Sequence, residues 1–119
     1  MPATVRAAFD AYPADVRAHL LTLRRAIFET ADALGLPVEE SLKWGQPSYA
    51  APKGSPIRLG APKGGGYALY AHCATRLIEE HRLVAPDLDY EGNRAVRLSG
   101  PPPLDALRPL IASALTYHR

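Results

Sequence analysis

The chain passes from helix to sheet within the segment Glu39-Glu40-Ser41-Leu42-Lys43-Trp44-Gly45-Gln46-Pro47-Ser48-Tyr49. This segment contains the only tryptophan, and it groups charged, amide, indole and phenol side chains. Val38, Leu42 and Trp44 are two or four residues apart, which favours a strand. Glu39 and Lys43 would also pair across one helical turn. We favour the strand, because a helix stops just before this segment.

A β-meander is predicted after a bend at 45–47. The turn-forming sequence Ala-Pro-Lys-Gly occurs twice, at 51–54 and 61–64, and a proline followed two places later by glycine is typical of turns. These turns lie at opposite ends of the strand between them. We therefore expect Lys53 and Lys63 to be too far apart to bind one anion. The strands predicted in this part of the chain are 38–44, 48–51, 57–61 and 66–71.

Apolar residues at helical spacing predict the helices. The clearest pattern runs from Asp15 to Leu34, where apolar residues recur every three or four positions, so one face of this helix should be buried. Pro109 is awkward in the last helix, which either starts near Asp105 or is kinked at the proline. The predicted helices are 3–11, 15–34, 74–85 and a C-terminal helix. The residues predicted to be core are Leu20, Leu23, Ile27, Leu77, Ile78, Leu107 and Ile111.

The order of these elements predicts an α+β fold. We expect an antiparallel sheet of about five strands, with one or two of them from 88–98, and three helices packed mainly on one face. The chain has 119 residues, which predicts a single domain over 1–119.

The composition of the chain excludes some classes of binding partner. The net charge is +2 without a dense stripe of lysine and arginine, so no nucleic-acid partner is predicted. No stretch is long and apolar enough to span a membrane. The single cysteine, Cys73, cannot form an internal disulfide, and the N-terminus lacks the pattern of a signal peptide, so we expect a cytoplasmic protein.

Five residues are candidates for a ligand-binding groove: Lys43, Trp44, Gln46, Tyr49 and Tyr70. Trp44 and Tyr49 would flank a shallow concavity, and the amide of Gln46 would orient a ligand. The alternative is that Trp44 is a core residue, which aromatic residues often are. Tyr67 and Tyr70 lie on opposite faces of one predicted strand, so one of them can face Trp44.

Other reactive residues support weaker hypotheses. Glu40 shares a strand face with Leu42, so burial could raise its pKa. Cys73, next to His72, would lie near the start of a helix, where a thiol can be acidified. His81 lies on the apolar side of that helix. The spacing of these residues matches no zinc motif, and neither a metal site nor a cofactor is predicted.

The segment Lys43-Trp44-Gly45-Gln46-Pro47-Ser48-Tyr49 resembles the bacterial YdhG-like family, a domain of unknown function. The resemblance covers nearly the whole chain, because the order of helices and strands around the motif is also similar. One branch of the family is described as a frataxin-like intracellular iron chaperone. The resemblance therefore implies a frataxin-like α+β fold and iron held by surface carboxylates.

The residues themselves predict weak or absent iron binding. The adjacent pairs Glu39-Glu40 and Glu79-Glu80 are far apart in sequence, and neighbouring residues of a strand point to opposite faces. We predict a small non-enzymatic binding domain with a groove near Trp44. The alternatives are an iron chaperone and a small enzyme using Glu40 or Cys73. The partner would be a small molecule or a protein, and the chain a monomer or homodimer.

Overall fold

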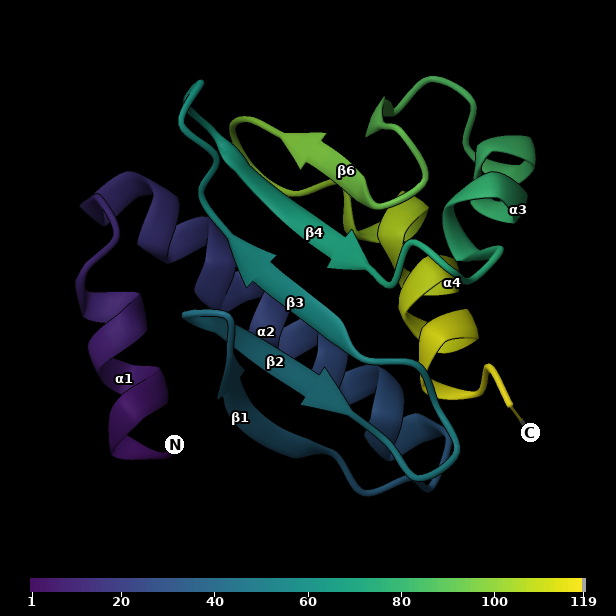
Figure 1. Ribbon diagram of the computed structural model, residues 1–119, viewed down its shortest axis with the longest axis horizontal. Coiled ribbons are helices and arrows are strands. Elements are labelled where there is room, and N and C mark those ends of the chain that lie inside the picture. The colour runs from purple at the N-terminus through teal and green to yellow at the C-terminus, as the bar shows by residue number, and fades with distance from the viewer. Residues whose placement is uncertain (119) are drawn as a thin grey trace.

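A computed structural model describes residues 1–118. This part of the chain forms four helices and six strands (Figure 1). The helices are α1 (Ala3–Asp10), α2 (Ala14–Ala33), α3 (Leu77–Val84) and α4 (Leu104–Leu115). The strands are β1 (Glu39–Lys43), β2 (Gln46–Ala50), β3 (Ile57–Gly60), β4 (Tyr67–Ala71), β5 (Asp89–Glu91) and β6 (Ala95–Leu98). None of the described helices is long and apolar enough to cross a membrane.

The α+β class is confirmed, but the expected counts of five strands and three helices are too low. The strands form one open sheet in the order β1-β2-β3-β4-β6-β5, and every neighbouring pair is antiparallel. The strand beyond the expected five is β5, at the edge of the sheet, which has only three residues. A strand this short carries too little side-chain alternation to be separated from a loop by sequence.

Helix α2 ends where the sequence predicts. Gly35 follows it with a φ of 69°, a conformation that glycine adopts without strain. The Leu36 N–H donates to the Ala31 carbonyl at 2.9 Å, and the Gly35 N–H donates to the Asp32 carbonyl at 3.0 Å. These two bonds form a Schellman motif, which satisfies the last helical carbonyls and turns the chain toward β1.

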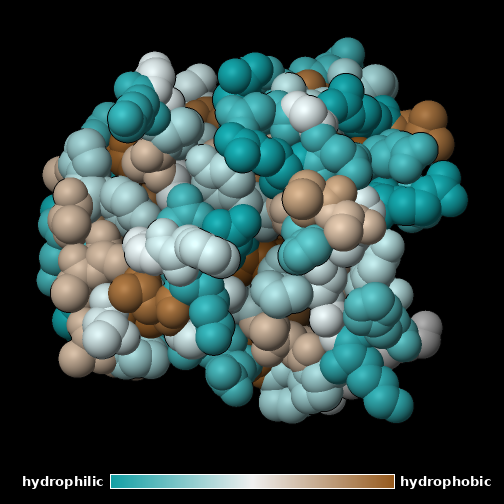
Figure 2. Space-filling view, viewed as in Figure 1, coloured by the Kyte–Doolittle hydropathy of each residue, from teal (hydrophilic) through white to brown (hydrophobic). Residues whose placement is uncertain are grey.

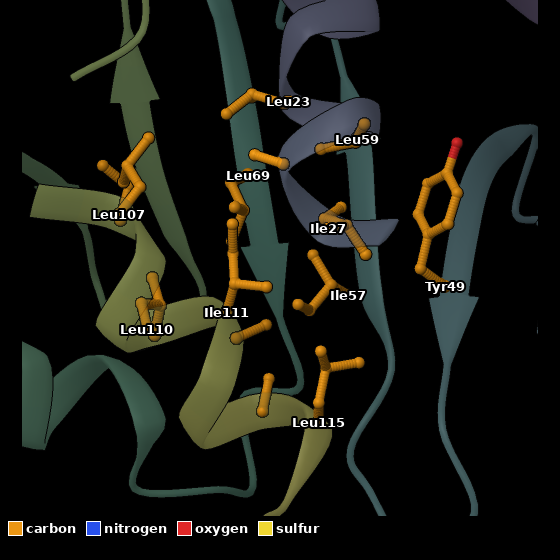
Figure 3. Packing of buried hydrophobic residues seen from close by; sticks show 14 of the residues in the cluster. Leu23, Ile27, Tyr49, Ile57, Leu59, Leu69, Leu107, Leu110, Ile111 and Leu115 are labelled. Atoms are coloured by element: carbon orange, nitrogen blue, oxygen red, sulfur yellow. The ribbon is translucent and has the colours of Figure 1, made fainter. Parts of the chain in front are cut away.

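The helices and the sheet make two layers. Helix α2 lies behind β2 and β3 in Figure 1, and α4 lies behind the other half of the sheet. Figure 3 shows Leu23 and Ile27 of α2 and Ile111 of α4 pointing at the inward-facing residues of β3 and β4. Each residue predicted to be core is buried, which confirms the helix faces. Those residues are Leu20, Leu23, Ile27, Leu77, Ile78, Leu107 and Ile111.

Helix α4 tolerates a proline beyond its first turn. The helix begins at Leu104, one residue from the expected start near Asp105, so Pro109 is its sixth residue. Pro109 removes one backbone N–H from the helix. Both Pro109 and Asp105, four residues earlier, are exposed, so water can reach the carbonyl that the proline leaves without a helical partner.

We expect Leu23→Ala or Ile27→Ala to lower the free energy of unfolding by about 2–5 kcal/mol, since each deletes buried methyl groups and leaves a cavity. Both side chains are fully buried. Urea denaturation measures the loss. Leu83→Ala is the matched control, because Leu83 is 85% exposed and its truncation should change stability by less than about 0.5 kcal/mol. Losses within error at both Leu23 and Ile27 would contradict the packing described above.

Candidate functional site: the open sheet face and the tip of the first hairpin

One face of the sheet is covered by no helix within residues 1–118, and Figures 1 and 2 look onto it. The register of the strands places a row of side chains across this face. This row consists of Ser41, Ser48, Arg58, Tyr70 and Ala95. Figure 2 shows hydrophilic and weakly hydrophobic groups here, with only small strongly hydrophobic patches. The open face is therefore a mixed surface and not a second core.

Trp44 stands at the tip of the hairpin between β1 and β2. Lys43 and Gln46 are paired, so Trp44 and Gly45 form a two-residue turn. Their φ angles are 55° and 75°, and a turn with both central φ angles positive is type I′. Such turns favour asparagine, aspartate and glycine. A bulky residue with positive φ is an outlier, because its Cβ crowds the backbone.

The indole of Trp44 is 90% exposed. The alternative that Trp44 is a core residue is therefore wrong. The turn lifts Trp44 out of the strand alternation that would have put it beside Leu42 and Glu40. The strand itself begins at Glu39 and ends at Lys43, so both Val38 and Trp44 lie outside it.

A hollow of about 260 Å³ lies on the open face beside Trp44. Serine, lysine, arginine, histidine and glutamate side chains line it, the last from Glu39. The polar and aromatic groups that matter most are Ser41, Lys43, Trp44, Ser48, Arg58 and His72. A second hollow of about 390 Å³ adjoins it at His72 and extends toward Tyr117 and His118. We call the first of these hollows the Trp44 groove.

Arg58 is held in place over the middle of the sheet. Its Nη1 donates to the Gln46 Oε1 at 3.0 Å, and its guanidinium lies 5.7 Å from the centre of the Tyr70 ring. Gly60 makes room for this arrangement, because a Cβ there would lie 2.5 Å from the Gln46 Nε2. Arg58, Gln46 and Tyr70 therefore form one assembly on the open face.

Four of the five predicted ligand-binding residues, Lys43, Trp44, Gln46 and Tyr70, belong to the open face or the hairpin tip. Tyr49 does not. It is fully buried on the opposite face, where its ring meets Phe28 of α2 edge to face. The expectation that Tyr49 flanks a concavity with Trp44 is wrong, because the turn puts Tyr49 opposite Glu40 on the helix-covered face.

Glu40 forms an ion pair with α2. Arg24 donates from Nε and Nη2 to the two Glu40 oxygens at 2.6 and 3.0 Å, and the Tyr49 hydroxyl donates to Glu40 Oε2 at 2.8 Å. Burial by itself raises the pKa of Glu40, but these hydrogen bonds outweigh it and hold that pKa below its ordinary value. The expectation of a raised pKa is wrong, and the contacts of this carboxylate fasten α2 to β1.

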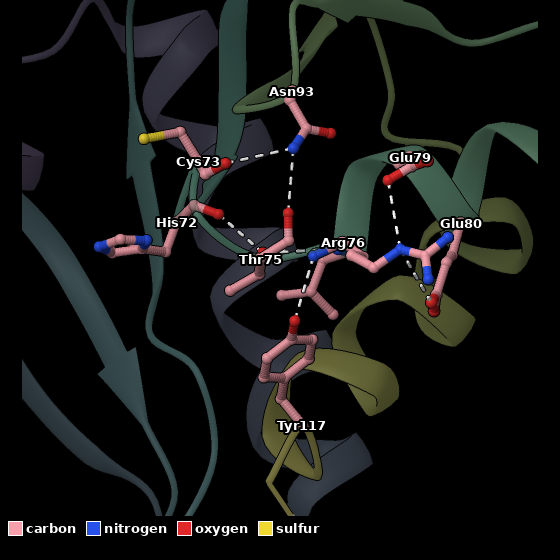
Figure 4. A network of polar contacts seen from close by, with 9 residues as sticks. His72, Cys73, Thr75, Arg76, Glu79, Glu80, Asn93 and Tyr117 are labelled. Atoms are coloured by element: carbon pink, nitrogen blue, oxygen red, sulfur yellow. Dashed lines mark hydrogen bonds and ion pairs between the residues drawn. The ribbon is translucent and has the colours of Figure 1, made fainter.

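The loop between β4 and α3 carries Cys73 and is anchored from two sides (Figure 4). The Asn93 amide donates to the carbonyls of Cys73 and Thr75 at 3.2 and 3.0 Å. The Arg76 N–H donates to the Tyr117 hydroxyl at 3.1 Å. Figure 4 shows the Cys73 thiol pointing away from these bonds.

The position of Cys73 differs from the expectation. Helix α3 begins only at Leu77, so Cys73 lies four residues before the helix and not at its N-terminus. The geometry on which the hypothesis of a reactive thiol depended is therefore not present. The neighbouring His72 accepts a hydrogen bond at Nδ1 from the Ala74 N–H at 3.1 Å, which leaves Nε2 as its free ring nitrogen at the groove.

His81 is buried on the apolar side of α3, as the sequence predicts. Its ring lies edge to face with Tyr90, 6.5 Å between centres, and Nε2 has no hydrogen-bond partner among the described residues. Burial lowers the pKa of His81, partly offset by a hydrogen bond to the Ala106 backbone. Burial therefore favours the neutral form of the ring in the folded protein.

A larger hollow, about 680 Å³, lies between the glycine-rich turn at 63–66 and the β5–β6 pair. Its charged groups neutralise each other, since Arg97 donates to Asp89 at 3.0 Å across the strands. Size alone does not make it the better site, and it contains neither an exposed aromatic ring nor an unpaired half-buried charge. In the chain up to residue 118, no group of three or more His, Cys, Asp or Glu side chains could hold a metal ion.

Comparison of the chain with protein-family models, with curated proteins and with solved structures finds no match in any of the three. The assignment of the candidate site therefore depends on the geometry of this structure alone.

Among the residues of the Trp44 groove that sequence reasoning missed are Ser41, Ser48, Arg58 and His72. Strand alternation would have placed Arg58 on one face of the third predicted strand and Tyr70 on one face of the fourth. Without the register, however, nothing in the sequence shows that these faces coincide. The cross-strand pairs Ser41–Ser48, Ser48–Arg58 and Arg58–Tyr70 supply that information.

We expect Arg24→Met to lower the free energy of unfolding at pH 7 by about 2–3 kcal/mol, because it leaves the Glu40 carboxylate buried without its partner. Fully buried pairs lose roughly 3–5 kcal/mol, and the Arg24 side chain is 26% exposed. The pKa of Glu40 is depressed in the folded state, so this stability should be present above about pH 4.5 and lost as pH falls further.

The double variant Arg24→Met/Glu40→Leu is the control, and it should recover most of the loss, since it leaves no buried charge. Urea denaturation at pH 7 and at pH 3.5 measures all three proteins. A double variant as unstable as Arg24→Met would show that packing, and not the unpaired charge, causes the loss.

We expect stability to fall as pH drops below about 6.5, the ordinary pKa of histidine. The unfolded chain binds a proton at His81 before the folded protein does, so acidification favours unfolding between 6.5 and the lower folded pKa. His81→Gln should flatten this part of the profile, measured as the urea midpoint from pH 7.5 to 5. The exposed His118 provides the matched control, and an equal flattening in His118→Gln would contradict the assignment.

Proposed function

We propose that this protein is a non-enzymatic binding domain and that its ligand enters the Trp44 groove. The observation that carries the proposal is Trp44 itself, a 90% exposed indole held at a positive φ of 55°. Backbone strain and exposure of a large ring both oppose stability. A residue that is costly on both counts points to a role outside folding.

The cost of Trp44 can be estimated. A residue with a Cβ in the left-handed region costs roughly 1–2 kcal/mol. Asparagine or aspartate would satisfy the same turn at lower cost. The indole also gains little from burial, because only a tenth of its surface is covered. Stability therefore gives no reason for tryptophan at this position, whereas an exposed ring beside a groove offers a stacking surface to a ligand.

The groove has the composition of a small-molecule site. Such sites combine apolar or aromatic surface with a few polar groups that fix orientation. Here Trp44 supplies the ring, Ser41 and Ser48 supply hydroxyls, and Arg58 supplies a positioned cation. Its volume of about 260 Å³ suits a compact ligand. Binding is favoured over catalysis because Glu40, the carboxylate considered for catalysis, is on the other face of the sheet.

Membership of the YdhG-like family is proposed on the segment from Lys43 to Tyr49 and on the order of the elements around it. The α+β architecture with one covered face is compatible with that resemblance. The two other candidate functions, an iron chaperone and a small enzyme using Glu40 or Cys73, stay predictions from the sequence.

We expect Trp44→Asn to separate folding from binding. Asparagine suits the type I′ turn better than tryptophan, so the free energy of unfolding should rise by about 0.5–1 kcal/mol. Binding should be abolished, because the ring is gone. Urea denaturation measures the first effect, and a small-molecule library screened by thermal shift against both proteins measures the second.

Fluorescence provides an independent control, because Trp44 is the only tryptophan. Its emission should be that of a solvent-exposed indole and should be quenched by acrylamide, with protection from quenching by any ligand that stabilises the wild-type protein. The proposal would be overturned by ligands that stabilise the wild type and Trp44→Asn equally, or by a blue-shifted, unquenched indole.

A further inference from the structure

Three arginines of the described chain are half-buried, and Arg58 is the one whose charge lacks full compensation. Arg24 has the Glu40 carboxylate at 2.6 Å. Arg17 donates to three backbone carbonyls at the end of α1. Arg58 has one amide oxygen, that of Gln46, and the face of Tyr70. No carboxylate within residues 1–118 forms an ion pair with it.

A guanidinium has five N–H donors in a fixed planar fork. Gln46 accepts from Nη1 of Arg58, so the donors on the other nitrogens stay free for a ligand in the groove. The Gln46 contact also limits the rotation of the side chain. A pre-positioned fork loses less entropy on binding, and it pairs with a carboxylate more strongly than with a neutral acceptor.

The neighbours of Arg58 complete an anion site. Ser48 lies directly opposite Arg58 in the sheet, and Ser41 lies opposite Ser48. Adjacent strands are about 4.8 Å apart, so two hydroxyls and the guanidinium follow one another across the floor of the groove. Lys43, which lines the same groove, forms no ion pair with any described residue.

From these observations we infer that the ligand of the Trp44 groove is a small aromatic carboxylate, whose carboxylate binds Arg58 and whose ring stacks on Trp44. This inference rests on the proposed binding function and names its ligand class. The groove holds a single positioned guanidinium, which matches one carboxylate in the two-pronged geometry that arginine favours.

A polyanion fits this face less well. Asp89 and Glu91 lie on the outer strand β5. A nucleic-acid strand crossing the sheet would meet these carboxylates, whereas a compact monoanion at Arg58 would not extend to β5. The small volume of the groove supports the same choice.

The test compares 2-naphthoate with 2-naphthamide, which share a ring and differ in charge. Each is titrated into the ¹⁵N-labelled full chain, and the indole N–H of Trp44 and the side-chain Nε–H of Arg58 are followed by NMR. We expect 2-naphthoate to shift both signals saturably and to bind about tenfold or more tightly than the amide, because hydrogen bonds between charged groups are the stronger ones.

Three variants locate the charge effect. Arg58→Gln should reduce 2-naphthoate binding to about the level of the amide and weaken amide binding far less, because a neutral carbonyl loses a weaker hydrogen bond than a carboxylate does. Arg97→Gln is the matched control, since Arg97 lies on the same sheet but is paired with Asp89, and it should bind 2-naphthoate like the wild type. Gln46→Ala should weaken 2-naphthoate several-fold without altering amide binding, because Gln46 positions the guanidinium. Thermal unfolding of each variant confirms that it is folded.

Each outcome bears on a distinct claim. Equal affinity for both probes, or an Arg58→Gln variant that weakens both equally, would overturn the aromatic carboxylate and leave the binding function standing. An absence of saturable shifts from either probe at millimolar concentration would also overturn the aromatic carboxylate, while the Trp44→Asn library screen decides the binding function separately. Loss of 2-naphthoate binding in Arg97→Gln equal to that in Arg58→Gln would place the anion outside the groove.

Discussion

The register of the first hairpin is the constraint on which the arrangement depends. The two-residue turn at Trp44–Gly45 pairs Lys43 with Gln46, and every pair along β1 and β2 follows from that. Glu40 and Tyr49 consequently face α2. A shift of one residue would exchange the two faces, placing a carboxylate and a phenol on the open side and serines under the helix. The hydrogen bonds of Arg24 and Tyr49 to Glu40 are therefore both a result of this register and a reason for its stability.

One-sided packing explains why the remaining face is available for a ligand. Helices α2 and α4 bury the apolar residues of the central strands, and the core is complete without a second layer. On the open side, Gly60 and Ala68 are paired across β3 and β4, and such small residues leave the sheet surface low. Longer side chains such as those of Arg58 and Gln46 lie across it. Small residues beneath long polar ones make a shallow groove instead of a flat surface.

Two half-buried arginines illustrate how the same residue type can serve the fold or the site. Arg24 binds the Glu40 carboxylate, to which the Tyr49 hydroxyl also donates, and its guanidinium lies 4.8 Å from the centre of the Phe28 ring. Its hydrogen bonding is internal, and it connects helix to sheet. Arg58 has a comparable aromatic neighbour but only an amide oxygen as acceptor. The unequal compensation of these two charges, together with the strained and exposed Trp44, is why the open face is the candidate site.

The sequence by itself determined the helices, the meander, the buried face of each helix and the end of α2, because periodicity and glycine or proline signals are local. It also marked Trp44, Gln46 and Tyr70 as residues of interest. It could not decide which residues share a face, since that depends on register between strands distant in sequence. Only the tertiary structure sent Tyr49 and Glu40 under α2, lifted Trp44 out of its strand and brought Arg58 beside Gln46. Those outcomes follow from a turn with two positive φ angles and from cross-strand pairing, neither of which hydrophobic periodicity encodes.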